Sequence, residues 1–286
     1  MEIHPSTLYI VGTPIGNLED MTFRAIQVLQ QVDAIAAEDT RHTGKLLHHF
    51  QMKTPQISYH DHNRTSRIPE LLRRLQQGQA IALVTDAGMP CVSDPGYELV
   101  KAAAEAGYAV VPIPGVTAVI TALAGSGLPS DRFTFEGFLP AKEKERLKQL
   151  QTLVTETRTL IFYEAPHRLR ETLQAMATVL GDSREMTIAR ELTKLHEEFW
   201  RGTLATAIQH YQQRDPQGEY TLVVKGAVIE TPPLTETVLR QELLDLIRQG
   251  SSRSQASRQL AEQTGLSRRQ IYQLALALPE VNELDE

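Results

Sequence analysis

Three glycine- and proline-bearing loops follow apolar runs in the first part of the chain. They read GTPIGN at 12–17, DAGMPCVSDPG at 86–96 and PIPGVTA at 112–118. Glycine lets the backbone approach a ligand closely, and proline restricts the freedom of the loop. Asp86 opens the second loop, where its carboxylate can accept hydrogen bonds from the hydroxyl or amino groups of a ligand.

None of these loops has a phosphate-binding signature. The chain contains no GxxxxGKS or GxxxxGKT stretch, and no GxGxxG opens its first predicted helix. A nucleotide diphosphate therefore fits poorly, and a ligand with an adenosine end, an amino-acid end and no phosphate fits better. S-adenosylmethionine meets that description, because its sulfonium cation suits backbone carbonyls and a nearby carboxylate. The alternative is structural, since Asp86 and Asp94 can each cap a helix instead.

Two other patterns point away from metal and thiol chemistry. HDHN at 60–63 places two histidines around Asp61, but alternate residues of an extended segment point apart and the spacing matches no zinc signature. Cys91 is the single cysteine, so no internal disulfide can form, and no partner for a nucleophilic thiol is visible. We expect no metal, and we expect Cys91 to be a small packing residue.

Strands and helices that alternate along the chain must position these loops. Over residues 1–130, β-rich runs such as STLYIVG and AIALVTD alternate with amphipathic stretches such as TFRAIQVLQQV and IPELLRRLQQG. Alternation of this kind favours a largely parallel sheet covered on both faces. Ligands bind beyond the carboxyl ends of such strands, which is where all three loops fall.

The rest of the chain divides into two further parts. Adjacent strands around residues 187–202 indicate a mixed sheet in a second α/β unit, and the Pro/Thr-rich stretch 228–236 reads as a linker. A helical pattern and an acidic tail follow. We therefore expect an α/β fold with an N-terminal domain over 1–130, a second α/β domain over 131–228 and a helical module over 235–279.

The helical module has helix-turn-helix spacing. In SQASRQLAEQTGLSRRQIYQLAL an apolar helix is followed by a turn at Gly265, and Ser267 then caps a second helix. Arg268, Arg269 and Tyr272 lie near the start of that second helix. Such units bind DNA, RNA or protein, and the alternative is a packing module that touches no nucleic acid.

Composition sets the broad class. The chain has 286 residues, of which 41% are apolar and 22% charged, a mix typical of globular proteins. Its net charge of −6 argues weakly against nucleic-acid binding, although a basic patch can lie on an acidic protein. No apolar run reaches the length of a membrane span, and the first residues lack the order of a secretory signal. We expect a cytoplasmic protein with no membrane partner.

Six motifs, in this order, closely resemble the ribosomal RNA small-subunit methyltransferase I family of the tetrapyrrole-methylase superfamily. They are LYIVGTPIGNLEDMTFRA, AEDTRHTGKLL, VTDAGMPCVSDPG, PGVTAVITALAGSGLP, FYEAPHRL and ARELTKLHEE, within residues 7–226. The resemblance implies two α/β domains with S-adenosylmethionine in the cleft between them, usually in a homodimer. It also implies 2′-O-methylation of a cytidine ribose in 16S rRNA near the decoding centre.

The resemblance also implies which residues hold the methyl donor, and all of them lie in the loops and in the FYEAP motif. They are Thr13, Pro14, Asp86, Ala87, Gly88, Met89, Thr117, Ala118, Tyr163, Glu164 and Ala165.

A ribose hydroxyl needs a general base, and three carboxylates at predicted strand ends are the candidates: Glu38, Asp39 and Glu164. For Asp39 the alternative is a helix N-cap. His167 and Glu191 are further candidates of lower rank. For His167 the alternative is that it begins the next helix and has no catalytic role.

Several cations near the predicted cleft and in the helical module are candidate phosphate contacts. These RNA-binding candidates are Arg41, Lys45, Arg168, Arg190, Lys194, Arg268 and Arg269. Each alone can be an ordinary solvated residue.

Two rival functions stay open. One is C-methylation of a tetrapyrrole, which GTPIG and TDAG weaken because porphyrin-type relatives usually have GxGPG and GDP there. The other is a DNA-binding regulator that senses a ligand through its α/β part.

Overall fold

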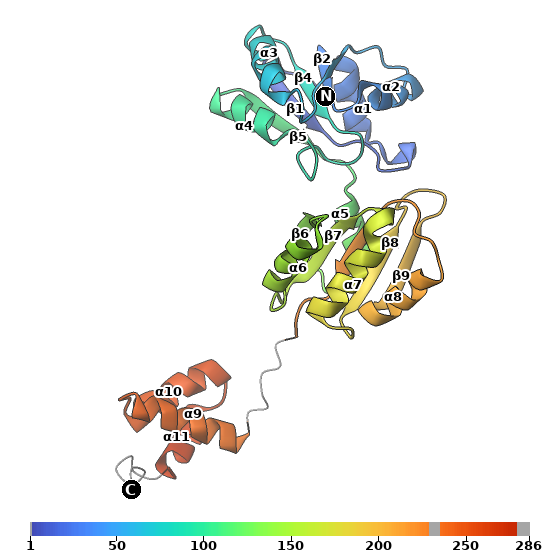
Figure 1. The fold of residues 1–286 in the computed structure, drawn as a ribbon. Helices are drawn as coiled ribbons and strands as arrows, with labels where there is room; N and C mark the ends of the chain where they lie inside the picture. The colour runs from blue at the N-terminus through green and yellow to red at the C-terminus, as the bar shows by residue number, and fades with distance from the viewer. Residues whose placement is uncertain (1, 229–234, 279–286) are drawn as a thin grey trace. The chain divides into compact units, whose positions relative to one another are not determined.

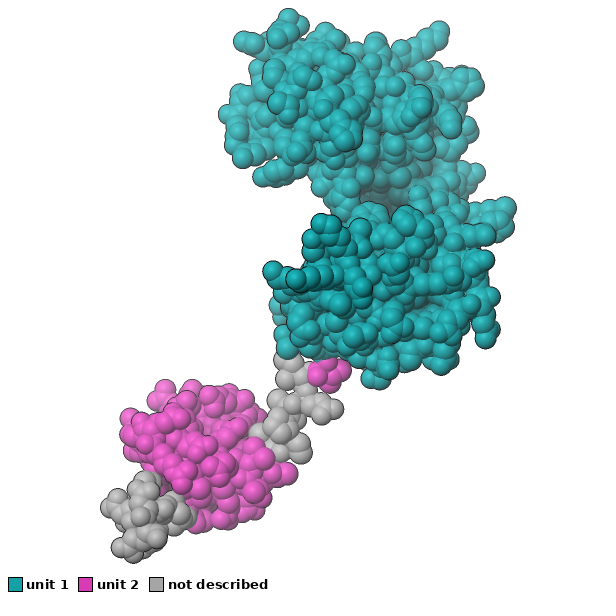
Figure 2. Space-filling view, viewed as in Figure 1, with its two compact units in different colours: residues 1–227 teal, residues 228–286 magenta. Residues whose placement is uncertain are grey.

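The computed structural model describes residues 2–228 and 235–278. The chain forms two compact units, Met1–Ala227 and Val228–Glu286, which Figure 2 colours separately. Each unit has a hydrophobic core of its own. Most of the predicted linker at 228–236 and all of the predicted acidic tail at 279–286 lie outside the described residues. No described helix is long and apolar enough to cross a membrane.

The first sheet of the larger unit has five parallel strands in the order β3-β2-β4-β1-β5. Most of these strands are buried apolar runs, as expected when helices cover both faces. Their carboxyl ends share one edge, so the loops that follow them meet there (Figure 1). The strands are β1 (Thr7–Val11), β2 (Ala34–Ala37), β3 (Gln56–Ser58), β4 (Ile81–Val84) and β5 (Ala109–Ile113).

Two pairs of helices cover this sheet. Leu46 of α2 packs in one core cluster with Tyr9, and Leu71 of α3 packs in another with Leu8. Because successive strand residues point to opposite faces, the two clusters lie on opposite sides of the sheet. The helices are α1 (Phe23–Gln31) and α2 (Thr40–His49) on one side, and α3 (Arg64–Gln76) and α4 (Tyr97–Glu105) on the other.

Helix α3 begins earlier than the sequence predicts. The amphipathic stretch IPELLRRLQQG predicts a helix that starts at Ile68. The helix in fact begins at Arg64 and runs through Pro69. Pro69 is the sixth residue of the helix, past its first turn, so the helix loses the one backbone hydrogen bond that an N–H at this position would donate.

The second sheet is mixed, in the order β6-β7-β10-β8-β9. Strands β6 and β7 are parallel, and the other neighbours are antiparallel. The predicted fold class, with a parallel first sheet and a mixed second sheet, is thereby confirmed. The strands are β6 (Phe133–Phe138), β7 (Thr159–Glu164), β8 (Glu185–Arg190), β9 (Glu198–Thr203) and β10 (Tyr220–Val224).

Helix α5 (Ala118–Ser126) packs on the second sheet, although it precedes the predicted boundary at residue 130. Its Val119 and Leu123 share a core cluster with Ile161 of β7 (Figure 1). The opposite face of the same sheet is covered by α6 (Glu143–Thr152), α7 (Leu169–Leu180) and α8 (Leu204–Gln212). The segment between Ile113 and Ala118 therefore connects the two sheets, and it carries the third ligand loop.

The smaller unit is a three-helix module around Leu243, Leu260 and Ile271. Ser267 caps the last helix by accepting a hydrogen bond from the backbone N–H of Gln270, as the sequence predicts. Gly265 ends the preceding helix with a left-handed φ of 69°, which glycine adopts without steric cost. The helices are α9 (Glu236–Arg248), α10 (Arg253–Thr264) and α11 (Arg268–Leu276).

Candidate active site

The loops after β1, β4 and β5 form one assembled surface at the carboxyl edge of the first sheet. Thr13 and Gly88 exchange backbone hydrogen bonds, at 2.9 Å from the Thr13 N–H and 3.1 Å from the Gly88 N–H. A β-carbon at Gly12 would lie 2.7 Å from the α-carbon of Gly115 and 2.7 Å from Sδ of Met89. Only glycine fits there, so the close approach of these loops is built into the sequence.

The loops after β2 and β4 are tied together through their acidic residues. The backbone N–H of Asp39 donates to Oδ1 of Asp86 at 3.2 Å, and the backbone N–H of Asp86 donates to Oε2 of Glu38 at 3.3 Å. Asp86 therefore positions the residue that caps α2. Burial raises the pKa of Glu38, the hydrogen bond from Asp86 lowers it, and the charge of Asp86 raises it again.

A cavity of about 380 Å³, called here the first cavity, lies between these loops and the second sheet. This volume is within the range of small-molecule sites, about 300–1,000 Å³. The cavity wall includes most of the residues predicted to bind the methyl donor: Ala87, Gly88, Met89, Thr117, Ala118, Tyr163, Glu164 and Ala165.

The chemistry of the first cavity suits a cation without phosphate. No arginine or lysine of the described chain lines it, and its ionisable lining groups are carboxylic acids and tyrosines, among them Asp94 and Tyr163. The Tyr163 ring contacts Phe135 and Phe138, with centroids 4.9 Å and 5.6 Å apart. Aromatic faces and carboxylates attract cations, so the residues present fit the sulfonium compound predicted from the sequence.

A second cavity, of about 370 Å³, adjoins the first. Both are lined by Ile15, Ala87 and Glu219, so the two share a wall. The second cavity holds the other residues predicted for the donor site, which are Thr13, Pro14 and Asp86. Its cationic and imidazole groups are His42, Lys45 and Lys194.

Asp94 is a site residue that sequence reasoning did not select. The sequence allowed it to cap α4, but the N-cap of that helix is Gly96 and no side chain caps it. Asp94 instead lines the first cavity. Burial, followed by the negative charges of Glu38 and Asp86, raises its pKa to about 7. The sequence feature that could have identified Asp94 is its position in the same loop as Asp86.

The predicted bases Asp39 and Glu164 both accept hydrogen bonds from neighbouring residues of the protein. Asp39 caps α2 through the Arg41 N–H at 2.8 Å, and hydrogen bonds with the Arg41 side chain hold its pKa well below the usual range. The Glu164 side chain is fully buried, accepts hydrogen bonds from the Ala165 N–H at 2.8 Å and from the Thr172 hydroxyl, and lies near Arg168. These contacts favour structural roles for both carboxylates.

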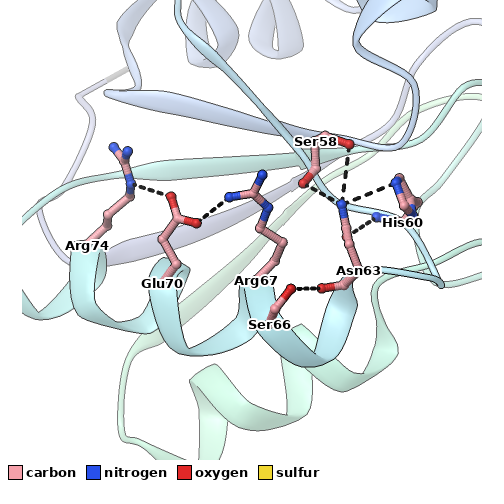
Figure 3. Close-up of polar contacts among 7 residues, drawn as sticks. All are labelled: Ser58, His60, Asn63, Ser66, Arg67, Glu70 and Arg74. Atoms are coloured by element: carbon pink, nitrogen blue, oxygen red, sulfur yellow. Dashed lines mark hydrogen bonds and ion pairs between the residues drawn. The ribbon is translucent and has the colours of Figure 1, made fainter.

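The HDHN stretch serves local structure (Figure 3). The Asn63 side chain accepts the His60 N–H at 2.9 Å and donates to the Ser58 carbonyl at 3.1 Å, which ties the end of β3 to the start of α3. Arg67 and Arg74 flank Glu70 farther along the helix. Within residues 2–228 and 235–278, no group of histidine, cysteine and acidic residues is arranged to hold a metal ion.

Three predicted RNA contacts are engaged within the protein. Arg168 donates to the Leu139 carbonyl, and Arg190 donates to the Gln217 carbonyl at 2.7 Å. Lys194 pairs with Glu191 and Glu219 at 2.9 Å and 2.8 Å. Of these three residues, Lys194 lines the second cavity, whereas the linings of the two cavities do not include Arg168 or Arg190.

The other predicted RNA contacts are exposed. Arg41 and Lys45 lie on α2, and Arg268 and Arg269 lie on α11. Arg268 donates to Oγ of Ser254 at 3.2 Å, and Arg41 pairs with Asp39 at 2.7 Å. These four residues remain accessible to a polyanion.

Comparison with known proteins shows which class of protein has this fold. Residues 7–208 match the family of tetrapyrrole (corrin/porphyrin) methylases, and residues 241–279 match the RsmI C-terminal HTH domain. The solved structure of uroporphyrin-III C-methyltransferase from Thermus thermophilus, complexed with S-adenyl homocysteine, has the same fold. Its TM-score is 0.56 at 17% identity, over 77% of this chain and 97% of that one. The fold of residues 7–208 is therefore that of the tetrapyrrole methylases.

Curated relatives narrow the class to a family. The chain is 62% identical over 272 residues to ribosomal RNA small subunit methyltransferase I of Synechocystis sp., covering 95% of this chain and 98% of the relative. It is 48% identical to the protein of the same name from Halalkalibacterium halodurans, covering 94% of both. The chain belongs to the ribosomal RNA small subunit methyltransferase I family. This membership confirms the predicted enzyme class, a methyltransferase, and supports the predicted donor.

Proposed function

We propose that this protein transfers a methyl group from S-adenosylmethionine to the 2′-hydroxyl of a cytidine ribose in 16S rRNA, near the decoding centre. The observation that carries the proposal is the first cavity, whose ionisable lining residues include carboxylates but no described arginine or lysine. Such a wall favours a cationic donor over a phosphorylated one. The names of the curated relatives supply the class of acceptor, small-subunit ribosomal RNA.

The donor supplies an electrophilic methyl group bound to a positively charged sulfur. The proposed donor site is the first cavity, with Ala87, Gly88, Met89, Thr117 and Ala118 from the loops and Tyr163, Glu164 and Ala165 from the end of β7. The other predicted donor residues, Thr13, Pro14 and Asp86, border it from the wall of the adjoining second cavity. Glu164 acts in this site by holding the turn after β7, through its bonds to Ala165 and Thr172. A fixed wall of this kind places the reacting atoms in line, and such orientation can be worth about 7–11 kcal/mol.

Asp94 is the proposed proton acceptor. It lines the first cavity, and its pKa of about 7 matches the requirement that a base be ionised near neutral pH yet still hold a proton. As the bond between the ribose oxygen and the methyl carbon formed, the methyl–sulfur bond would break, S-adenosylhomocysteine would leave as a neutral thioether, and the hydroxyl proton would pass to the Asp94 carboxylate. Glu38, whose pKa is also raised, is the second candidate for the base. The depressed pKa of Asp39 makes that residue a poorer base.

The three parts of the chain have different roles in the proposed function. Residues 1–130 supply the donor loops, 131–228 close the cleft, and 235–279 orient the RNA through Arg268 and Arg269. We expect a homodimer in the cytoplasm, where small ribosomal subunits are assembled.

The rival functions are less favoured. A tetrapyrrole methylase has no use for the arginine-bearing module that matches the RsmI C-terminal HTH domain. A DNA-binding regulator would need two recognition helices about one DNA turn apart and would not need a base in the first cavity.

The test has two stages. Calorimetric titration with S-adenosylmethionine should show one site per chain, and the purified protein should then transfer labelled methyl groups to undermethylated small-subunit particles. The same assay with a porphyrinogen acceptor should give no transfer. Donor binding with transfer to the porphyrinogen and none to the particles would replace the proposal with the tetrapyrrole function.

A further inference from the structure

The solvent-facing side of α2 is basic and imidazole-rich along its whole length. Its exposed residues recur at helical spacing and are Arg41, His42, Lys45, His48 and His49, called here the α2 face. The opposite side of the helix buries Thr43, Leu46 and Leu47 against the sheet. No acidic residue lies within Thr40–His49, but Arg41 pairs with Asp39, the N-cap of the helix, so Lys45 is the cation of the α2 face that carries the argument.

This face contrasts with the rest of the protein. The chain has 35 acidic and 29 basic residues, and many of its described arginines and lysines form ion pairs. No ion pair or hydrogen bond from the Lys45 ammonium to another described residue is found, and the side chain is exposed. A free lysine that is flanked by histidines on an acidic protein is a local positive feature.

The α2 face continues into the second cavity. His42 and Lys45 line that cavity together with Thr13, Asp86 and Ala87. Ala87 also lines the first cavity, so a group in the second cavity can lie beside one in the first. A strand that followed the α2 face would therefore lead to the place where the two cavities meet.

We propose that the second cavity receives the target nucleotide and that the α2 face holds the flanking single-stranded RNA. This inference rests on the proposed function and names the surface that serves it. Lys45 contacts a phosphate, because exposed lysines supply the sequence-independent part of RNA affinity. Imidazole rings donate hydrogen bonds and stack on unpaired bases, which is the contact assigned to His42 and His48.

The occupant is RNA, because its chemistry complements both parts of the surface. The sugar–phosphate backbone matches the cations, and exposed bases match the rings. An acidic protein segment would satisfy the cations alone and would leave the adjoining nucleotide-sized cavity without a ligand. Assembled subunits contain both RNA and protein, so the test must separate the two.

The test compares Lys45→Glu and His48→Glu with Arg73→Glu as a matched control. Arg73 is an exposed cation on α3, which covers the opposite face of the same sheet. Fluorescence anisotropy would measure affinity for a single-stranded fragment of small-subunit rRNA at several salt concentrations. Calorimetry would measure affinity for S-adenosylmethionine, and Lys45→Arg would test rescue by charge.

We expect Lys45→Glu to weaken RNA binding about tenfold. The slope of the logarithm of the association constant against the logarithm of the salt concentration should become shallower by about 0.7 for each lost phosphate contact. Donor affinity and thermal stability should not change, and both Arg73→Glu and Lys45→Arg should behave as the unmodified protein. If Lys45→Glu matches Arg73→Glu in RNA affinity and salt dependence, the inference fails although methyl transfer persists. If only binding to assembled particles falls, the surface binds a ribosomal protein, which also overturns it. Absence of methyl transfer by the unmodified protein would instead refute the proposed function.

Discussion

The backbone N–H of Asp39 donates a hydrogen bond to the Asp86 carboxylate at 3.2 Å, which joins the loops that follow two adjacent parallel strands. Asp39 in turn caps α2, and Asp86 begins the loop that lines both cavities. One carboxylate therefore links the donor loops to the helix proposed to hold RNA.

Replacing Asp86 should lower both the stability of the fold and the affinity for the methyl donor. Asp86→Ala removes the acceptor and leaves the half-buried Asp39 N–H without its protein partner, at a cost of up to about 1 kcal/mol, the low end of the range for a buried donor. We expect a lower free energy of unfolding and at least a tenfold loss of affinity for S-adenosylmethionine, measured by thermal unfolding and calorimetry. Asp86→Asn keeps the oxygen acceptor and should recover most of the stability. Unchanged donor affinity in Asp86→Ala would remove Asp86 from the donor site.

The contact between Gly12 and Gly115 predicts a steric requirement. Gly12→Ala would place a β-carbon 2.7 Å from backbone, so the loops must separate. We expect a loss of stability of about 1–3 kcal/mol and loss of donor binding, by chemical unfolding and calorimetry. Gly44→Ala is the control, because its β-carbon would lie 3.6 Å from the nearest atom, within a helix. That variant should gain up to about 1 kcal/mol and keep its activity.

The pKa of Asp94 predicts how the rate of methyl transfer depends on pH. The rate should rise as Asp94 ionises and level off above about pH 7. Asp94→Asn should lose about 10²–10⁴-fold in kcat and lose this inflection, with a much smaller loss of donor affinity because Tyr163, Glu164 and Glu219 still line the cavity. Single-turnover rates between pH 5 and 9 would measure both effects. If the inflection of the pH–rate profile is unchanged in Asp94→Asn, another group accepts the hydroxyl proton, and Glu38 is the next candidate.

Asp94 should also make folding stability depend on pH. Its pKa is raised from 3.8 to about 7 in the folded protein, so the folded state binds the proton more tightly than the unfolded chain. The contribution of this group to stability therefore falls as pH rises from about 4 to about 7. Asp94→Asn should be relatively more stable at pH 8 than at pH 5, by differential scanning calorimetry. An equal difference in Tm at both pH values would show that burial of Asp94 imposes no such penalty.

Local signals in the sequence predict the elements well and the site in part. Ser267 marks the start of a helix because capping is local, and the apolar β4 run marks a strand covered on both faces. Strand β10 lies between β7 and β8, and α5 packs on the second sheet; these placements depend on contacts distant in sequence.

The site shows the same division. The loop motif identifies Gly88 and Met89, but the role of Asp94 depends on burial and on the charges of Glu38 and Asp86, which only the folded chain brings together. Likewise, Arg190 reads as a free cation in the sequence and is paired with Glu198 in the fold.

Mass spectrometry of nucleosides tests the proposed ribose methylation directly, with undermethylated small-subunit particles incubated with this protein and methyl-labelled S-adenosylmethionine. The proposed function predicts label in 2′-O-methylcytidine, and its loss with Asp94→Asn. Label on a base, or no label in the RNA despite donor binding, would contradict it.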